Sequence, residues 1–106
     1  MPSITITTPT SGSTVLHTFP AGGMYAVGAL DTENGNNYIT SSVTQNGAVL
    51  DTKTYPIPAR APTGPWSVEH TVSGSTKLTG CVVTASLFVN AVLQQSADVT
   101  DITIDG

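Results

Sequence analysis

The sequence predicts an all-β fold in which two antiparallel sheets pack face to face as a sandwich of seven to eight strands. Three observations favour this class. Hydrophobic and polar residues alternate over short runs, Gly, Pro, Asn and Asp separate those runs, and threonine, which favours strands, is the most frequent residue. The chain of 106 residues has the usual size of a domain with one core, so we expect a single domain over residues 1–106.

The N-terminal third should supply edge and central strands. The run at residues 4–7 alternates isoleucine with threonine just before Pro9, which indicates a strand at a sheet edge, where proline is tolerated. The alternating Val15, His17 and Phe19 should continue that edge on the second sheet. Residues 24–31 should form a central strand packed on one face.

A hairpin is predicted next. Residues 38–45 alternate with Ile39 and Val43 on one face, and residues 48–55 should form the return strand. The Asn46-Gly47 dipeptide between them is typical of a type I′ turn, because both central positions of that turn need positive φ.

The second half should hold a crossover and three strands. Residues 56–65 contain four prolines, which cannot donate to a central ladder, and should cross the surface. In residues 66–72, Trp66, Val68, His70 and Val72 alternate with more polar residues, which predicts a strand. Residues 78–88 form the longest apolar run and should lie mid-sheet, with alternate residues buried: Cys81, Val83, Ala85 and Leu87.

The last strand has a change of phase. Val99, Ile102 and Ile104 are all expected to face inward, although their positions differ in parity. A β-bulge, which inserts one extra residue into a strand, would bring the three onto one face.

The order of the runs 4–12, 25–29, 81–86 and 99–104, with Trp66 between them, resembles bacterial immunoglobulin-like modules over nearly the whole chain. The resemblance implies an antiparallel immunoglobulin-like β-sandwich. It also implies tandem repetition in large secreted or cell-surface proteins, where such modules are spacers, adhesins or accessory domains. The chain would then enter at one pole of the sandwich and leave at the other. No catalytic residue is implied, and the paired cysteines of antibody domains are absent.

Enzyme chemistry is not expected. An acyl-transfer triad needs a nucleophile, a histidine and an acid in contact. His17 and His70 share strand faces with apolar residues, which indicates structural roles for both. Cys81 should be a buried, inert thiol, since no basic residue lies near it in sequence. No cofactor is expected.

The segment 31–37 is the richest in oxygen ligands. Asp31, Glu33 and Asn36 are of the kind that Ca²⁺ accepts, although the pattern is not that of an EF-hand. We interpret the segment as a solvated turn, with a calcium site as the alternative.

A ligand platform would need two exposed aromatic rings side by side. Tyr38 and Tyr55 flank the predicted hairpin and are the candidates, whereas Trp66 is expected to anchor the core.

Charge and hydropathy limit the partners. The three basic residues Lys53, Arg60 and Lys77 lie far apart in a chain of net charge -4, so nucleic acid is not expected as a partner. The longest apolar runs are far shorter than the roughly 20 residues of a spanning helix, so no membrane insertion is expected.

We expect a non-catalytic structural or interaction module, a spacer or adhesive domain of a larger protein. Residues 1–4 carry no secretory signal, but few lysines with much Thr, Ser, Asn and Gly favour a fragment of an extracellular or cell-surface protein. Its partners would be neighbouring domains of the same polypeptide. The alternative is a module that binds protein or carbohydrate through the loops at one pole.

Overall fold

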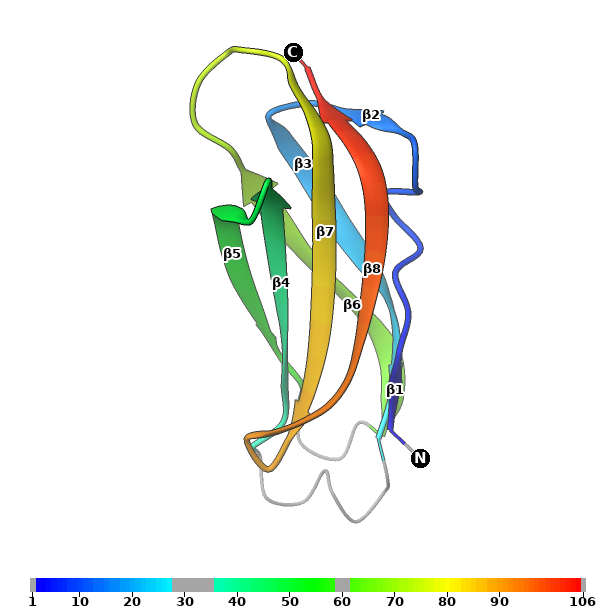
Figure 1. Cartoon of the computed structure of the whole chain (residues 1–106). Coiled ribbons are helices and arrows are strands. Elements are labelled where there is room, and N and C mark those ends of the chain that lie inside the picture. Colours follow the sequence, from blue (N-terminus) through cyan, green and yellow to red (C-terminus); the bar gives the residue numbers. More distant parts are fainter. Residues whose placement is uncertain (1, 28–35, 59–61, 106) are drawn as a thin grey trace.

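The computed structural model describes residues 2–27, 36–58 and 62–105 (Figure 1). These residues form eight strands, and no helix among them is long and apolar enough to span a membrane. The strands are β1 Ser3–Ile4, β2 Thr14–Val15, β3 Thr18–Ala26, β4 Tyr38–Gln45, β5 Ala48–Pro56, β6 Thr63–Thr71, β7 Leu78–Val89 and β8 Val92–Ile104.

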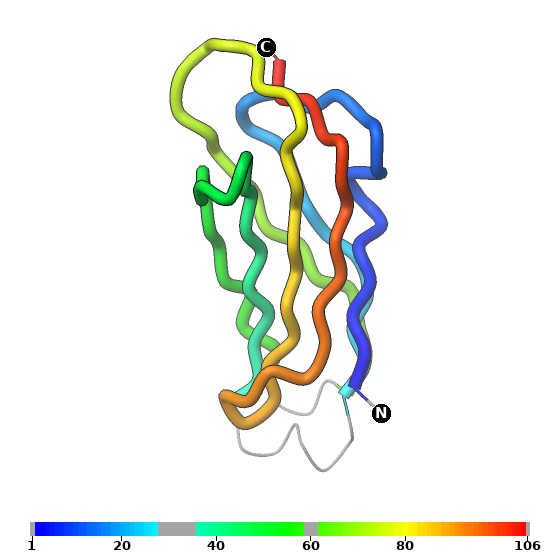
Figure 2. Tube along the Cα trace, viewed as in Figure 1, coloured from blue at the N-terminus to red at the C-terminus, as the bar shows by residue number. Residues whose placement is uncertain are grey.

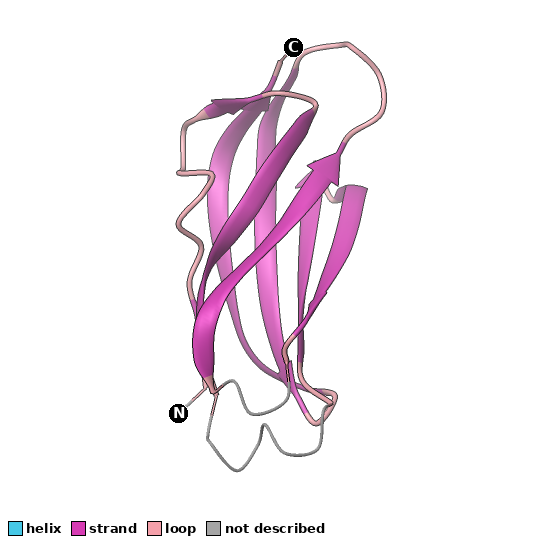
Figure 3. Cartoon of the chain, turned by 180° about the vertical axis from the view of Figure 1, so that it is seen from behind, coloured by secondary structure: helices cyan, strands magenta, loops and turns pink. Residues whose placement is uncertain are grey.

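The strands make two sheets, which confirms the predicted all-β, two-sheet architecture. One has three strands in the order β1-β3-β6, and the other five in the order β2-β8-β7-β4-β5. Seen from behind, β3 and β6 cross in front of the five-stranded sheet (Figure 3). The molecule is elongated, 45 × 20 × 20 Å, and β1 begins at the end opposite to the one where β8 finishes (Figures 1 and 2).

The prediction that every pair is antiparallel is wrong for β2. This strand runs parallel to β8, with Thr14 opposite Thr103 and Val15 opposite Ile104. The reason is that the N-terminal segment stays bonded to β3 as far as Thr8, then passes to the five-stranded sheet and runs in the same direction as β8 (Figure 1).

The third strand starts earlier than predicted. Phe19 belongs to β3, opposite His70 in the three-stranded sheet, and so does not continue the edge of the second sheet as expected. Gly22 and Gly23 lie inside β3, where other backbone comes very close to both. A Cβ at Gly22 would overlap the carbonyl oxygen of Trp66 in β6, and a Cβ at Gly23 would overlap the carbonyl oxygen of Thr5 in the N-terminal segment. Residues 28–31 of the predicted strand lie outside the described residues.

The β4–β5 hairpin is confirmed. β4 has the predicted bounds, and Asn46 and Gly47 have φ of 52° and 83°, as a type I′ turn requires. The proline-rich crossover is shorter than predicted, since Pro56 ends β5 and Pro65 lies in β6. Because β6 is an edge strand that pairs with β3 alone, its outer side has no ladder for a proline to interrupt.

The predicted central strand and bulge are also confirmed. β7 lies in the middle of the five-stranded sheet, and its alternate residues from Cys81 to Leu87 are fully buried. Between the pairs Cys81–Ile102 and Val83–Val99, β8 has one residue more than β7. Asp101, in that bulge, has φ of 58°.

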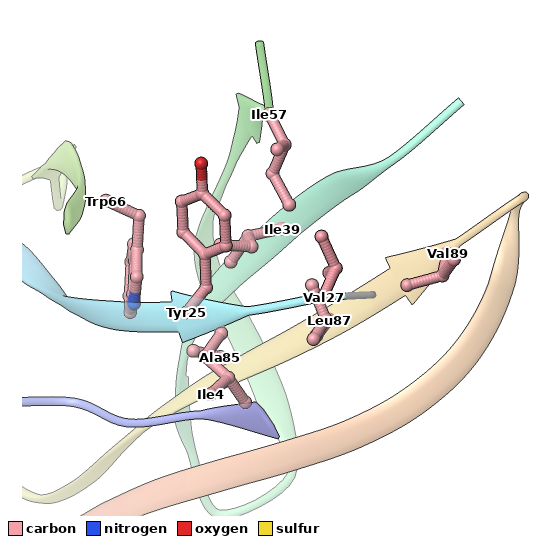
Figure 4. Packing of buried hydrophobic residues seen from close by; sticks show 9 residues of the cluster. All are labelled: Ile4, Tyr25, Val27, Ile39, Ile57, Trp66, Ala85, Leu87 and Val89. Carbon is pink, nitrogen blue, oxygen red and sulfur yellow. The ribbon is translucent and has the colours of Figure 1, made fainter. Parts of the chain in front are cut away.

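The core fills the space between the sheets in two clusters. Trp66 anchors one of them, as predicted, with 2% of its surface exposed, and its Nε1 donates a 3.0 Å hydrogen bond to the carbonyl of Thr5. Figure 4 shows this cluster: Ile4, Tyr25, Val27, Ile39, Ile57, Trp66, Ala85, Leu87 and Val89.

Candidate functional site

A chain of hydrogen bonds joins three side chains from three strands. Ser41 Oγ of β4 lies 2.8 Å from Nε2 of His70 in β6, and Nδ1 of His70 lies 2.7 Å from Oδ2 of Asp51 in β5. The chain links the two sheets across the interior, because β6 belongs to the three-stranded sheet and the other two strands to the five-stranded one.

Strand alternation places two of these residues inside. Ser41 lies between Ile39 and Val43 on the inner face of β4, and His70 has the same parity as Trp66 in β6. Both Ser41 and His70 have 0% exposure. Buried polar groups of this kind need partners, and each supplies the partner of the other.

A β-bulge turns the third residue inward. Val43 pairs with Asp51 but Thr44 pairs with Val49, so β5 carries one extra residue, Leu50. Counted from the two-residue turn without the bulge, Val43 would face Leu50, and Asp51 would point to the outer surface. The bulge therefore aims the carboxylate of Asp51 at His70.

The surroundings of His70 and Asp51 shift the pKa values of both groups. Burial lowers the pKa of His70, and this effect outweighs the hydrogen bond and the charge of Asp51, which raise it. The pKa of Asp51 is also below its usual value. Burial alone would raise this pKa, but the hydrogen bonds from His70 and from the amide of Thr71 lower it and outweigh the effect of burial. An ionised carboxylate can only accept, so Nδ1 of a neutral His70 donates to Asp51, and Nε2 accepts from Ser41.

Two further contacts hold the side chains of Asp51 and His70 in place. The backbone amide of Thr71 donates a 3.2 Å hydrogen bond to the same Oδ2 of Asp51. The ring of Phe19 lies 5.5 Å from the ring of His70, centroid to centroid. Asp51 therefore connects the edge strands β5 and β6 at two successive residues.

The order Ser, His, Asp is that of an acyl-transfer triad, but the environment differs from an enzyme site. A nucleophile must contact the substrate carbonyl, and Ser41 Oγ lies between the two sheets, where Ser41 has no exposed surface. No pocket opens at it in the part of the chain that the structure describes. In this conformation the chemistry available to the three groups is hydrogen bonding across the core.

His17 does not belong to the hydrogen-bonded group of Ser41, His70 and Asp51. It is buried, and its Nε2 lies 3.0 Å from the carbonyl oxygen of Thr76, while its Nδ1 has no hydrogen-bond partner among the described residues. The backbone carbonyl of His17 accepts from the amide of Val72, which holds the end of β3 against the end of β6.

Of the candidate ligands for the alternative calcium site, only Asn36 lies in the described residues. Asp31 and Glu33 lie outside the described residues. Asn36 is exposed, and its carbonyl accepts a 3.2 Å hydrogen bond from the amide of Ala91. Within residues 2–27, 36–58 and 62–105, no three His, Cys, Asp or Glu side chains form a group that could hold a metal ion.

Tyr38 and Tyr55 are not brought together. Tyr55 pairs with the buried Ile39 and packs against the core, so it faces inward, whereas Tyr38 faces the outer side of the sheet. The ring of Tyr38 stacks on Phe88, with centroids 4.9 Å apart and planes 16° apart. Along the same outer row, Phe88 is followed by Leu93, which is 54% exposed.

Cys81 lies near the start of β7, on its inner face, with no exposed surface. Burial raises the pKa of its thiol, which keeps the thiol protonated and weakly nucleophilic.

No protein-family model matches the chain, and no curated protein is similar to it.

Sequence reasoning missed Ser41 and Asp51. For Ser41 a signal existed, since a small polar residue between Ile39 and Val43 on an inward face needs a polar partner, and His70 has inward parity on its own strand. For Asp51 there was no such signal, because its parity relative to the Asn46-Gly47 turn places it outside.

Proposed function

We propose that this domain is a non-catalytic, load-bearing spacer of immunoglobulin-like type within a larger secreted or cell-surface protein. The observation that carries the proposal is the parallel pairing of β2 with β8, in a molecule whose first and last strands begin and end at opposite poles. Its partners would be the neighbouring domains of the same polypeptide.

The strand order supports the immunoglobulin-like assignment. The three-stranded sheet holds the first, third and sixth strands, and the other sheet holds β8, β7, β4 and β5 in that order. Immunoglobulin-like sandwiches divide their strands in this way, with Greek-key connections. The parallel β2 adds an edge strand to the five-stranded sheet.

The contacts between β2 and β8 suit a load applied through the two ends. Backbone hydrogen bonds run from Thr103 N to Ser13 O (3.0 Å) and from Asp105 N to Val15 O (2.8 Å). The segment just before β2 adds a bond from Gly12 N to Thr100 O (3.1 Å). Tension at opposite poles would slide β2 along β8, so these bonds would carry the load together.

The side-chain evidence also favours a spacer over an enzyme or a sugar-binding module. Among the described residues, Ser41 is the only nucleophile found beside a histidine and an acid. It is fully buried in the core, where a substrate could not reach it. The ring of Tyr38 stacks on Phe88, and Tyr55 faces inward, so the two candidate tyrosines do not form a flat platform for a sugar.

Single-molecule pulling tests the proposal. The domain is stretched through its two ends and, in a second geometry, between Ser75→Cys and the C-terminal end. Ser75 is exposed in the loop between β6 and β7. This loop lies at the same end of the molecule as the end of β8 (Figure 2), so the second geometry peels β8 instead of shearing it.

We expect a several-fold higher unfolding force through the two ends than in the peeling geometry. Thr103→Pro removes one amide donor of the β2–β8 pair and should lower the force through the two ends by a larger factor than the peeling force. Equal forces in the two geometries would refute a load-bearing role.

A further inference from the structure

The N-terminal segment, residues 2–15, lies between the edges of the two sheets. Its first half bonds to β3, where the amide of Thr5 donates a 2.9 Å hydrogen bond to the carbonyl of Met24. Its second half bonds to β8, where the carbonyl of Val15 accepts a 2.8 Å hydrogen bond from the amide of Asp105. Figure 1 shows the segment running along the side of the sandwich next to β8. The segment therefore closes this side of the sandwich.

Strands β3, β6 and β8 form a shaped site for this segment. At Gly23 the absence of a side chain makes room for the carbonyl of Thr5, which a Cβ would overlap. Nε1 of Trp66 donates a 3.0 Å hydrogen bond to the same carbonyl, and Oε1 of Gln95 accepts a 2.7 Å hydrogen bond from the amide of Ile4. The side chain of Ile4 fills the core cluster that contains Trp66. The site thus binds the main chain and one apolar side chain, as in strand addition to a sheet edge.

A single residue connects the anchored end of the segment to β3. The carbonyl of Val15 is bonded to Asp105 at the end of β8, and the carbonyl of His17 is bonded to the amide of Val72 just after β6. Leu16, between these two anchors, is 62% exposed. Nδ1 of His17 has no hydrogen-bond partner among the described residues. Because Leu16 is poorly packed, little is lost when this connection straightens.

We propose that the site between β3 and β8 is a strand-acceptor site, which takes the N-terminal segment of a second copy of the chain, with Leu16 as the hinge. The segment makes the same hydrogen bonds and core contacts in either copy, since the two sequences are identical. Exchange changes only the hinge and adds the entropy cost of association. The proposal does not depend on the load-bearing role of the β2–β8 pair, and its tests apply no force.

The site is selective for the sequence of this segment. Ile4 and Ile6 alternate inward, and Ile6 packs against both core clusters. Thr5 and Thr7 lie between and beside them on the outer side, and their hydroxyls reach backbone carbonyls of β3. A foreign strand would need the same alternation of isoleucine and threonine to make these contacts. A second copy of the chain supplies it in full.

Deletion of Leu16 tests the hinge. It makes Val15 and His17 direct neighbours, with Cα atoms about 3.8 Å apart. The segment then cannot keep its register on both β8 and β3, and a shift of one residue would reverse the face of its side chains. In an exchanged dimer the two anchors belong to separate domains, which can move to restore the register.

We expect the deletion variant to sediment as a dimer and the wild type as a monomer. Insertion of two glycines after Leu16 is the matched control, because it lengthens the hinge and should leave a monomer. A deletion variant that stays monomeric at high protein concentration, or an insertion variant that dimerises, would overturn the proposal.

A second measurement covers the case in which the deletion variant does not fold. Ile4→Asp disables the segment, because it places a charge in the core, and leaves the acceptor site intact. Gly23→Ala disables the acceptor site and leaves the segment intact. The two chains, one of them isotope-labelled, are mixed unfolded and refolded together. Native mass spectrometry should then show a one-to-one heterodimer, in which the intact segment occupies the intact site.

The control mixture lacks any intact segment. It combines Ile4→Asp with a chain that carries both Ile4→Asp and Gly23→Ala, and it should give no heterodimer. A first mixture without heterodimer, or equal amounts of heterodimer in the two mixtures, would show that the segment is not exchanged between copies.

Discussion

His70 and Asp51 lie 2.7 Å apart, nitrogen to oxygen, although they belong to different sheets and the hairpin turn alone would aim Asp51 outward. The Leu50 bulge makes the contact possible. Leu50 itself packs against the core cluster that contains Phe19 and Val43, so both residues of the bulge are used inside the sandwich.

Asp51→Ala should therefore destabilise the domain. The substitution leaves Nδ1 of the fully buried His70 without an acceptor, which costs about 1 to 3 kcal/mol. Denaturant unfolding at neutral pH measures the loss. Asp98→Ala is the matched control: Asp98 is exposed on β8, so its removal should change the free energy of unfolding by less than about 0.5 kcal/mol. Equal effects of the two substitutions would show that the hydrogen bond between Asp51 and His70 adds no stability.

The two hairpin turns allow opposite substitutions at equivalent positions. Asn46-Gly47 and Asn90-Ala91 both have positive φ at both residues, with Gly47 at 83° and Ala91 at 63°. A residue with a Cβ pays about 1 to 2 kcal/mol in this region. Gly47→Ala should lower the melting temperature, and Ala91→Gly should raise it. A rise for Gly47→Ala would contradict the strain assigned to these turns.

Gly23→Ala should be among the most damaging single-methyl changes. The new Cβ would overlap the carbonyl oxygen of Thr5, so β3 or the N-terminal segment must move, at a cost of about 1 to 3 kcal/mol or more. The free energy of unfolding measures it. At Gly64 the same substitution meets only the side chain of Tyr25, at 3.4 to 3.7 Å, and should be tolerated. If Gly23→Ala unfolds like Gly64→Ala, the close passage of the N-terminal segment is not maintained in solution.

Cys81 should react slowly with thiol reagents. It is fully buried, and burial raises the pKa of its thiol, so reaction under native conditions must await unfolding. A raised pKa also means that stability is intact below the ordinary value of 9.0 and falls as the pH rises above it. In Ser75→Cys, which retains Cys81, one thiol should react at once and the other only in denaturant. Two rapid reactions would contradict the burial of β7.

Calcium should not control folding. A site that binds Ca²⁺ only in the native state would add about 2.7 kcal/mol at a hundredfold excess over its dissociation constant. Such a gain raises the melting temperature by roughly 10 to 20 °C in a domain of this size. Asp31 and Glu33 are the only carboxylates in the segment 31–37, so we expect the melting curves in calcium and in chelator to overlay. A rise of several degrees that Asp31→Ala abolishes would establish a metal site.

The sequence by itself determined what local alternation and turn chemistry encode. The alternating residues of β4, β6 and β7 fixed their inner faces, and Asn46-Gly47 fixed the hairpin, because side-chain direction in a strand and φ in a tight turn depend on near neighbours. Even the bulge near Asp101 could be predicted, since the phase of the hydrophobic residues changes within β8 itself.

Only the tertiary structure decided which strands meet and what the polar residues between them do. β2 pairs with β8, almost the whole chain away, and β3 begins at Thr18, before its glycines, where it pairs with the end of β6. In β5 the one-residue bulge falls at Leu50, and it turns the next residue, Asp51, from solvent to His70. These contacts depend on register and on the packing of one sheet against the other, and a shift of one residue reverses the face of every side chain that follows.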